Sequence, residues 1–122
     1  MPEKIKGLWF EYLDGKAAEA KSEAERLAKE DRRDEAWHMK VRENIYRVFK
    51  TVFSALEAAL TGDGLREGYL NKIGEISQNW HDSLDKGREH NDAERVLIEG
   101  VKLNVYQQVK EKFVEIWGAE YD

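Results

Sequence analysis

The sequence predicts an all-α protein, and more specifically an up-down-up-down four-helix bundle built from two repeated helical hairpins. Three observations lead to this fold class. Apolar side chains recur at helical spacing in four segments of about 25 residues each. Residues that stop helices are few, since the only proline is at position 2. The pattern of the first half also recurs in the second half.

The first helix is expected to run from about Pro2, a residue suited to the first helical turn, to about Glu30. Its second half is rich in alanine, so its apolar face is thin there. The second helix follows Asp31 or Asp34 as N-cap and has the strongest apolar face in the chain. That face contains Trp37, Val41, Ile45, Val48, Phe49, Val52, Phe53, Leu56 and Leu60.

The third helix is predicted from about Asp63 to Gly87, and the fourth from Asn91 to Gly118. Asn91 is expected to cap the fourth helix, with Glu94 completing a capping box. The third helix carries Leu65, Tyr69, Ile73, Ile76, Trp80 and Leu84 on one face. The predicted core face of the fourth contains Leu97, Val101, Val105, Val109, Phe113 and Ile116.

Two shifts of the sequence against itself describe the internal repeat. The first shift matches the Gly-Leu pair at 7–8 with the one at 64–65, and it matches Tyr12 with Tyr69. The second shift matches the segment 41–53 with the segment 101–113 at Val, Asn, Tyr, Lys and Phe positions. The second shift is longer by three positions, which predicts three extra residues in the second inter-helix turn. These matches predict that hairpin 2–61 recurs as hairpin 63–118 within a single domain, residues 1–122.

Short connections make consecutive helices antiparallel neighbours, which predicts a bundle whose halves are related by a pseudo-two-fold axis. The alternative is two stacked hairpins, as in a tetratricopeptide solenoid. The helices are too long for the roughly 34-residue period of such arrays, and two hairpins fall short of the about three repeats they need. The closed bundle is therefore the preferred prediction.

Composition excludes several classes of function. The chain has no cysteine, which rules out disulfides, thiolate catalysis and Cys-ligated metal sites. The net charge of −5 argues against nucleic-acid binding, and no segment approaches the roughly 20 apolar residues of a membrane span. The N-terminal segment lacks the apolar run of a signal peptide, so a cytoplasmic location is expected. Catalytic motifs such as Gly-x-Ser-x-Gly and the Walker loop are absent, so neither enzymatic activity nor a cofactor is expected.

Indole and imidazole side chains gather toward one end of the predicted bundle: Trp37, His38, Trp80, His81 and His90. This group is the candidate pocket for a small molecule or metal, with His38 or His81 as the general base of an enzyme. The spacing contains no His-Glu-x-x-His, and its one Glu-x-x-His, from Glu35 to His38, lacks the second copy that a di-metal bundle uses, so no metal ligand set is predicted. The competing interpretation is that both tryptophans fill the core and the histidines are capping or exposed residues.

One difference between the halves indicates binding to a partner. Val96, Leu103 and Val114 fall on the side of the fourth helix opposite its predicted core face. The equivalent positions of the second helix hold alanine, glutamate and serine. These three residues are the candidate interface, unless the helix is rotated so that they complete the core.

The sequence thus predicts a non-enzymatic cytoplasmic helical module for protein–protein interaction or self-association. The expected partner is a second copy of the chain, giving a homodimer, or an amphipathic helix of another protein. The alternative function is a helical bundle that binds a small molecule or metal at the Trp37/Trp80/His81 end.

Overall fold

The computed structural model describes residues 2–121, which form four helices. Helix α1 spans Pro2–Lys29, α2 spans Arg33–Glu57, α3 spans Gly62–Glu89 and α4 spans Ala93–Tyr121. The pairs α1–α2 and α3–α4 pack closely along their lengths as antiparallel hairpins. The predicted fold class, an all-α four-helix bundle of two hairpins, is confirmed.

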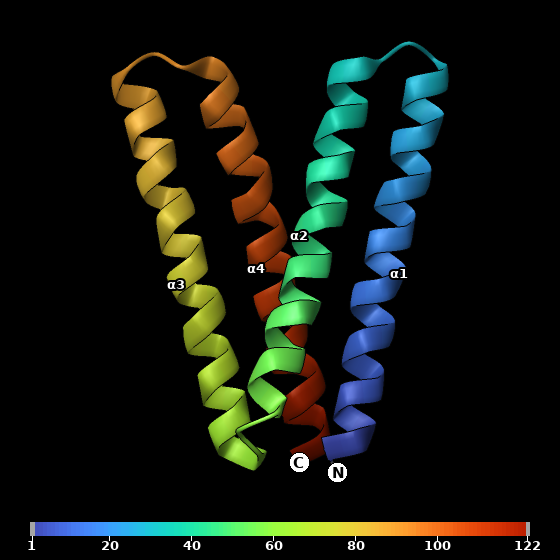
Figure 1. The fold of residues 1–122 in the computed structure, drawn as a ribbon, viewed down its shortest axis with the longest axis vertical. Helices are drawn as coiled ribbons and strands as arrows, with labels where there is room; N and C mark the ends of the chain where they lie inside the picture. The colour runs from blue at the N-terminus through green and yellow to red at the C-terminus, as the bar shows by residue number, and fades with distance from the viewer. Residues whose placement is uncertain (1, 122) are drawn as a thin grey trace.

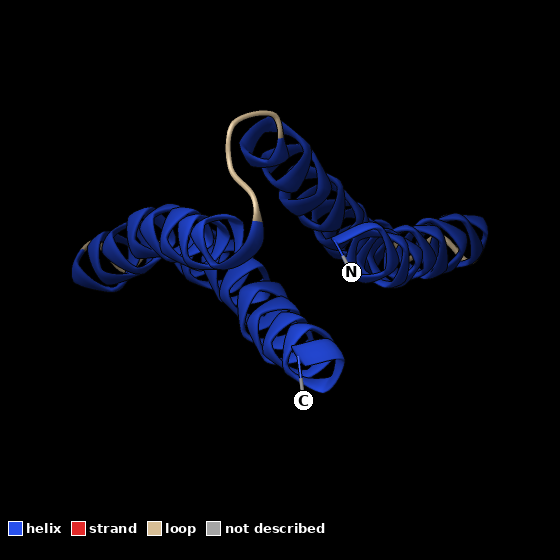
Figure 2. Ribbon diagram, turned by 90° about the horizontal axis from the view of Figure 1, so that it is seen from below, coloured by secondary structure: helices blue, strands red, loops and turns tan. Residues whose placement is uncertain are grey.

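The two hairpins meet at one end of the molecule and diverge at the other (Figure 1). Both ends of the described chain and the α2–α3 connection lie where the hairpins meet, which we call the closed end. The α1–α2 and α3–α4 turns lie at the opposite end, the open end. Seen from the closed end, the hairpins run outward in different directions (Figure 2). Helices α2 and α4 contact each other and the helices of both hairpins, so they occupy the centre.

Aromatic side chains from all four helices form the core near the closed end. The ring centroids of Trp9 on α1 and Phe113 on α4 are 5.1 Å apart, and Tyr69 on α3 lies 4.8 Å from Phe113. Phe53 on α2 packs edge-on against Tyr69 at 5.2 Å. All four side chains are buried. Since each ring buries about 150–250 Å², this cluster supplies much of the apolar contact between the hairpins.

Small residues line the helix contacts toward the open end. Ala20 and Ala24 of α1 and Ala36 of α2 are buried. In the second hairpin, a Cβ atom built on Gly87 would lie 3.1 Å from Cγ2 of Val96. Alanine and glycine let the two helices of a hairpin approach closely but provide little apolar area for further helices. This explains why the hairpins are joined near the closed end and diverge beyond it.

The two hairpins correspond at one constant shift of 60 residues along the chain, which is the separation between Trp9 and Tyr69. Helix α1 begins at residue 2 and α3 at residue 62, while α2 begins at residue 33 and α4 at residue 93. The turns share a backbone conformation, with φ of 60° at Asp31 and 54° at Asn91. Buried positions follow the same shift: Ile5, Trp9, Leu13 and Ala24 of α1 correspond to Leu65, Tyr69, Ile73 and Leu84 of α3.

The shorter shift predicted for the first and third helices, which matches Tyr12 with Tyr69, does not describe this structure. It pairs Leu8, which is 39% exposed, with Leu65, which is 5% exposed. Equivalent residues of a repeated hairpin share their burial, so the matching Gly-Leu and Tyr-Leu pairs do not mark equivalent positions. The two turns between helices also have equal length, residues 30–32 and 90–92, and no insertion separates them. A common origin of the hairpins by duplication stays a prediction.

Two predicted helix ends are wrong in detail. Arg32 is the N-cap residue of α2, and neither Asp31 nor Asp34 caps this helix. Helix α3 continues past Gly87 to Glu89, because Gly87 is a helical residue that packs against α4 rather than a stop.

The predicted capping box of α4 is wrong as well. Asn91 has a positive φ and lies in the turn. The next residue, Asp92, caps the helix instead, since its Oδ1 accepts a hydrogen bond from the backbone N–H of Arg95 at 3.1 Å.

Candidate binding surface at the open end

The inner sides of α2 and α4 carry the same classes of side chain where the hairpins diverge. Each helix has an acidic residue, a large apolar residue three positions later and a valine four positions after that. The α4 residues correspond to the α2 residues at the same shift that relates the starts of the two helices, residues 33 and 93. We call these six residues the mouth: Asp34, Trp37 and Val41 on α2, and Glu94, Leu97 and Val101 on α4.

Helical periodicity directs the mouth toward the space between the hairpins. Val41 and Val101 precede Ile45 and Val105 by about one turn, so each valine lies on the same side of its helix as the residue that follows. Ile45 and Val105 are buried in the core that both hairpins share. The mouth thus continues the core surface beyond the point where α2 and α4 part.

The Trp37 side chain is 46% exposed, so the interpretation of Trp37 as a core residue is wrong. It borders an open cavity of about 380 Å³ between the hairpins. Arg95 of α4 and Ser83 of α3 also line this cavity. The Nε of Arg95 donates a hydrogen bond to Oγ of Ser83 at 2.8 Å. The remaining lining residues are Asp92 of the α3–α4 turn and Glu94, Ile98 and Glu99 of α4. An exposed indole facing another element is typical of a contact residue at an interface.

Leu97 is 52% exposed, although the sequence predicts it on the core face of the fourth helix. The prediction fails because this part of α4 lies beyond the shared core, where the first hairpin no longer covers it. Leu97 borders a second open cavity of about 560 Å³ at the α3–α4 turn, together with Ala93 and Val96. Single exposed apolar residues are ordinary. Two of them at equivalent positions beside the divergence of the hairpins make a candidate binding surface.

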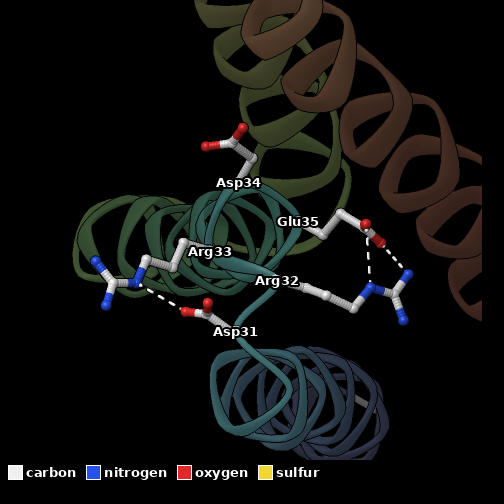
Figure 3. A pocket seen from close by; sticks show the side chains of 5 residues that line it. All are labelled: Asp31, Arg32, Arg33, Asp34 and Glu35. Carbon is white, nitrogen blue, oxygen red and sulfur yellow. Dashed lines mark hydrogen bonds and ion pairs between the residues drawn. The ribbon is translucent and has the colours of Figure 1, made fainter.

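Among the described residues, neither carboxylate of the mouth has a hydrogen bond or an ion pair. The arginines next to them in sequence are already engaged. Arg33, beside Asp34, pairs with Asp31 at 3.3 Å, and the arginine beside Glu94 is bonded to Ser83. Asp34 points away from the Arg33–Asp31 pair and from α1 (Figure 3). The mouth is therefore an apolar surface that carries negative charge.

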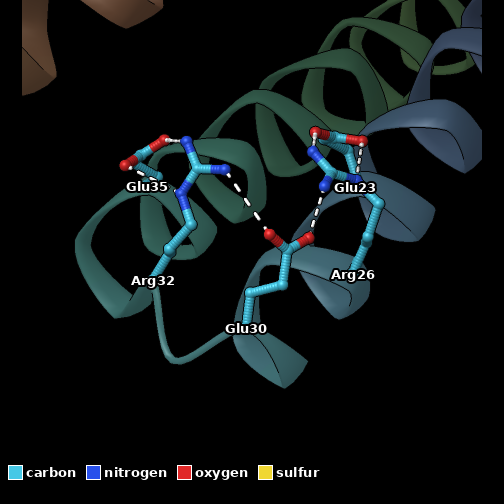
Figure 4. A network of polar contacts seen from close by, with 5 residues as sticks. All are labelled: Glu23, Arg26, Glu30, Arg32 and Glu35. Carbon is cyan, nitrogen blue, oxygen red and sulfur yellow. Dashed lines mark hydrogen bonds and ion pairs between the residues drawn. The ribbon is translucent and has the colours of Figure 1, made fainter.

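The α1–α2 turn itself is lined by exposed charged residues 31–35, and all of them except Asp34 form ion pairs within this segment rather than converge on a site. Arg26 binds Glu23 and Glu30, while Arg32 binds Glu30 and Glu35 (Figure 4). Exposed ion pairs contribute little each, about 0–1 kcal/mol, so this network mainly orders the turn. The equivalent positions of the second hairpin hold different residues: Ser83, Lys86, His90, Asp92 and Arg95.

Trp80, the second tryptophan of the predicted pocket, belongs to the packing between the hairpins. Its ring lies 5.9 Å from that of Phe49, and the ammonium of Lys102 lies 5.9 Å from its ring centroid. Trp80 is half-buried and packs against the core. It therefore lies in a different environment from Trp37.

The histidines of the predicted pocket are also in separate environments. His38 is half-buried with its ring 6.1 Å from that of Trp37, while His81 and His90 are exposed. Among the described residues, no three His, Asp or Glu side chains are grouped to hold a metal ion. A small-molecule or metal site at this end stays a prediction.

The three residues of the predicted interface differ in exposure. Val96 is half-buried against Gly87 within the second hairpin. Leu103 is half-buried, and Val114 is 41% exposed. Val114 is the most exposed of the three, and an interface at this stripe stays a prediction.

None of the helices in the described part of the chain has the length and apolar character needed to cross a membrane. The chain was compared with protein-family models, curated proteins and solved structures, and none of them matches it.

Proposed function

We propose that this protein is a non-enzymatic helical interaction module that binds an amphipathic helix of a partner protein at the mouth. The observation that carries the proposal is the exposure of Trp37 and Leu97 at equivalent positions on a surface continuous with the core. A partner helix lying between α2 and α4 extends the packing that already joins the hairpins. Full burial of a large apolar side chain contributes about 1.5–3 kcal/mol, so two such residues support a specific contact. We place this activity in the cytoplasm, the location expected from the sequence.

A second copy of the chain is the other candidate partner. Val114, 41% exposed on α4, supports this alternative because its side chain lies outside the core and outside the mouth. A self-association surface of this kind is isologous, with the same patch on both copies.

A small-molecule site beside Trp37 is less well supported. The cavity there is open, and most of its lining residues carry charge. Sites for small molecules are usually concave and mostly apolar. The mouth resembles a contact surface more than such a pocket.

The test of the proposed function uses a synthetic amphipathic peptide of about 18 residues, with leucine at helical spacing and glutamine elsewhere. Its binding to the wild-type protein is measured by fluorescence anisotropy of a dye on the peptide. The double variant Trp37→Ala/Leu97→Ala is expected to bind about tenfold or more weakly, because it removes the two apolar contacts.

The matched control is Leu8→Ala/Val114→Ala, which removes two side chains of similar exposure outside the mouth. This variant is expected to bind the peptide as the wild type does. An equal loss in both double variants would contradict the proposal.

A further inference from the structure

We infer that the partner helix is basic, with lysine or arginine beside the apolar residues that enter the mouth. This inference rests on the proposed function, since it names the chemistry of the partner at the same surface. It depends on the carboxylates of the mouth and on their position relative to Trp37.

Trp37 lies between carboxylates of both hairpins. Asp34 precedes it by three residues on α2, which places the two side chains on neighbouring positions of one helix surface. Glu94 lines the same cavity as Trp37 from α4, and Asp92 lines it from the α3–α4 turn. Glu99 lines it too, but this buried carboxylate is paired with Lys102. An exposed indole ring bordered by acidic groups from two elements suits a cationic side chain better than a neutral one.

Lysine and arginine match this arrangement because their side chains are amphipathic. The aliphatic stem covers the ring while the charged head reaches a carboxylate. A cation over the face of an indole adds a cation–π attraction. Lys102 already pairs with Glu99 at 2.9 Å. Arg95 lines the same cavity with its Nε bonded to Ser83, but this one cation stands beside two carboxylates without ion pairs, Asp34 and Glu94.

The α4 side of the mouth has the same combination of an acidic residue and a large apolar residue. Glu94 precedes Leu97 by three residues, as Asp34 precedes Trp37. Neither Asp34 nor Glu94 has a partner among the described residues. A helix that spans the mouth thus meets an acidic group beside an apolar group on each side.

Charge also disfavours a second copy as the occupant of the mouth. Two mouths facing each other bring four unpaired carboxylates together, and like charges across an interface weaken binding. The net charge of −5 on each chain adds to this repulsion. A basic helix of another protein is attracted by the same charges.

The experiment compares three labelled peptides of about 18 residues that share one leucine face and differ elsewhere, carrying lysine, glutamine or glutamate. We expect the lysine peptide to bind most tightly and the glutamate peptide most weakly. In Asp34→Asn/Glu94→Gln, we expect the lysine peptide to bind about fivefold more weakly and the glutamine peptide to bind as in the wild type.

The matched control is Glu3→Gln/Asp63→Asn. It makes the same change in net charge and also removes acidic residues from the first turns of two helices, but at the closed end. We expect its affinity for the lysine peptide to stay within about twofold of wild type at moderate salt. Circular dichroism of both double variants verifies that the helices remain folded.

Equal affinity for the three peptides, or an equal loss in the two charge variants, would overturn the inference. The proposed function then still stands if Trp37→Ala/Leu97→Ala weakens binding of the glutamine peptide. Failure of every peptide to bind, or binding of the lysine peptide that is insensitive to Trp37→Ala/Leu97→Ala, overturns the proposed function and the inference together.

Discussion

The indole Nε1 of Trp9 donates a hydrogen bond to the hydroxyl of Tyr69 at 3.2 Å, and the two residues occupy equivalent positions of the two hairpins. The Tyr69 hydroxyl in turn donates to the backbone carbonyl of Phe49 at 2.9 Å. This buried chain of hydrogen bonds connects α1, α3 and α2 inside an otherwise apolar core. Because an unpaired polar group is costly there, it fixes how one hairpin is placed on the other.

Tyr69→Phe is expected to lower the free energy of unfolding by about 1–3 kcal/mol, because the Trp9 indole loses its buried acceptor. Urea denaturation followed by circular dichroism measures this change. Tyr12→Phe is the control, since the half-buried Tyr12 hydroxyl makes no hydrogen bond with the described residues. Equal stability of the wild type and Tyr69→Phe would show that the hydrogen-bond chain is not important for the core.

Stability is expected to fall as pH rises above about 10, the ordinary pKa of tyrosine. Burial raises the pKa of Tyr12 to about 12 and also raises the pKa of Tyr69, which the Trp9 hydrogen bond lowers in part. Above pH 10 the unfolded chain loses these protons while the folded chain keeps them, so alkaline pH favours unfolding. Tyr12→Phe/Tyr69→Phe should show a shallower decline in urea midpoints between neutral and alkaline pH. A decline as steep as in the wild type would assign it to other groups, such as the lysines.

Gly87→Ala is expected to destabilise the protein by about 1 kcal/mol, although alanine is the better helix former. The added methyl group would meet Val96 Cγ2 at 3.1 Å and Arg95 Cγ at 3.3 Å. Gly15→Ala is the matched control in α1, where nothing lies within 4 Å of an added Cβ, and it should gain about 0.5–1 kcal/mol. Thermal and urea unfolding of the two variants measure the difference. If both variants gain stability, the second hairpin tolerates a wider helix contact than the structure indicates.

If the protein self-associates through the predicted stripe, Val114→Glu should convert a dimer into a folded monomer. Size-exclusion chromatography with light scattering determines the mass in solution. Leu97→Glu at the mouth is the comparison, because it places a charge at another exposed apolar site. A wild-type monomer at tens of micromolar, roughly the range of weak dimers, would contradict the self-association alternative.

Most of the fold could be predicted from the spacing of apolar side chains. The four helices and both hairpins follow from runs such as Ile45, Phe49 and Phe53, which are all buried as expected. The repeat was harder to place, because identical pairs such as Gly-Leu favoured matching Tyr12 with Tyr69, whereas the structure matches Trp9 with Tyr69. Burial, rather than residue identity, marks equivalent positions, and burial is not visible in a single sequence.

The candidate site was predicted only in part. Trp37 was identified as a functional candidate, but the mouth was missed because Leu97 fits the apolar spacing of a core residue. Helical periodicity shows which side of α4 faces inward, but not where along the helix the first hairpin stops covering it. That point depends on the aromatic cluster around Phe113 and Tyr69, which forms between segments far apart in the chain. Extending the match of segment 41–53 with 101–113 toward the N-terminus would have paired Trp37 with Leu97.

Both ends of the described chain lie at the closed end, on the far side of the molecule from the mouth. A tag or fluorescent protein joined to either end is therefore carried away from the open end. Immobilisation through such a tag orients every molecule with Trp37 and Leu97 toward the solution. The same geometry means that an anchor attached to either terminus leaves the turns of the two diverging hairpins facing away from that anchor.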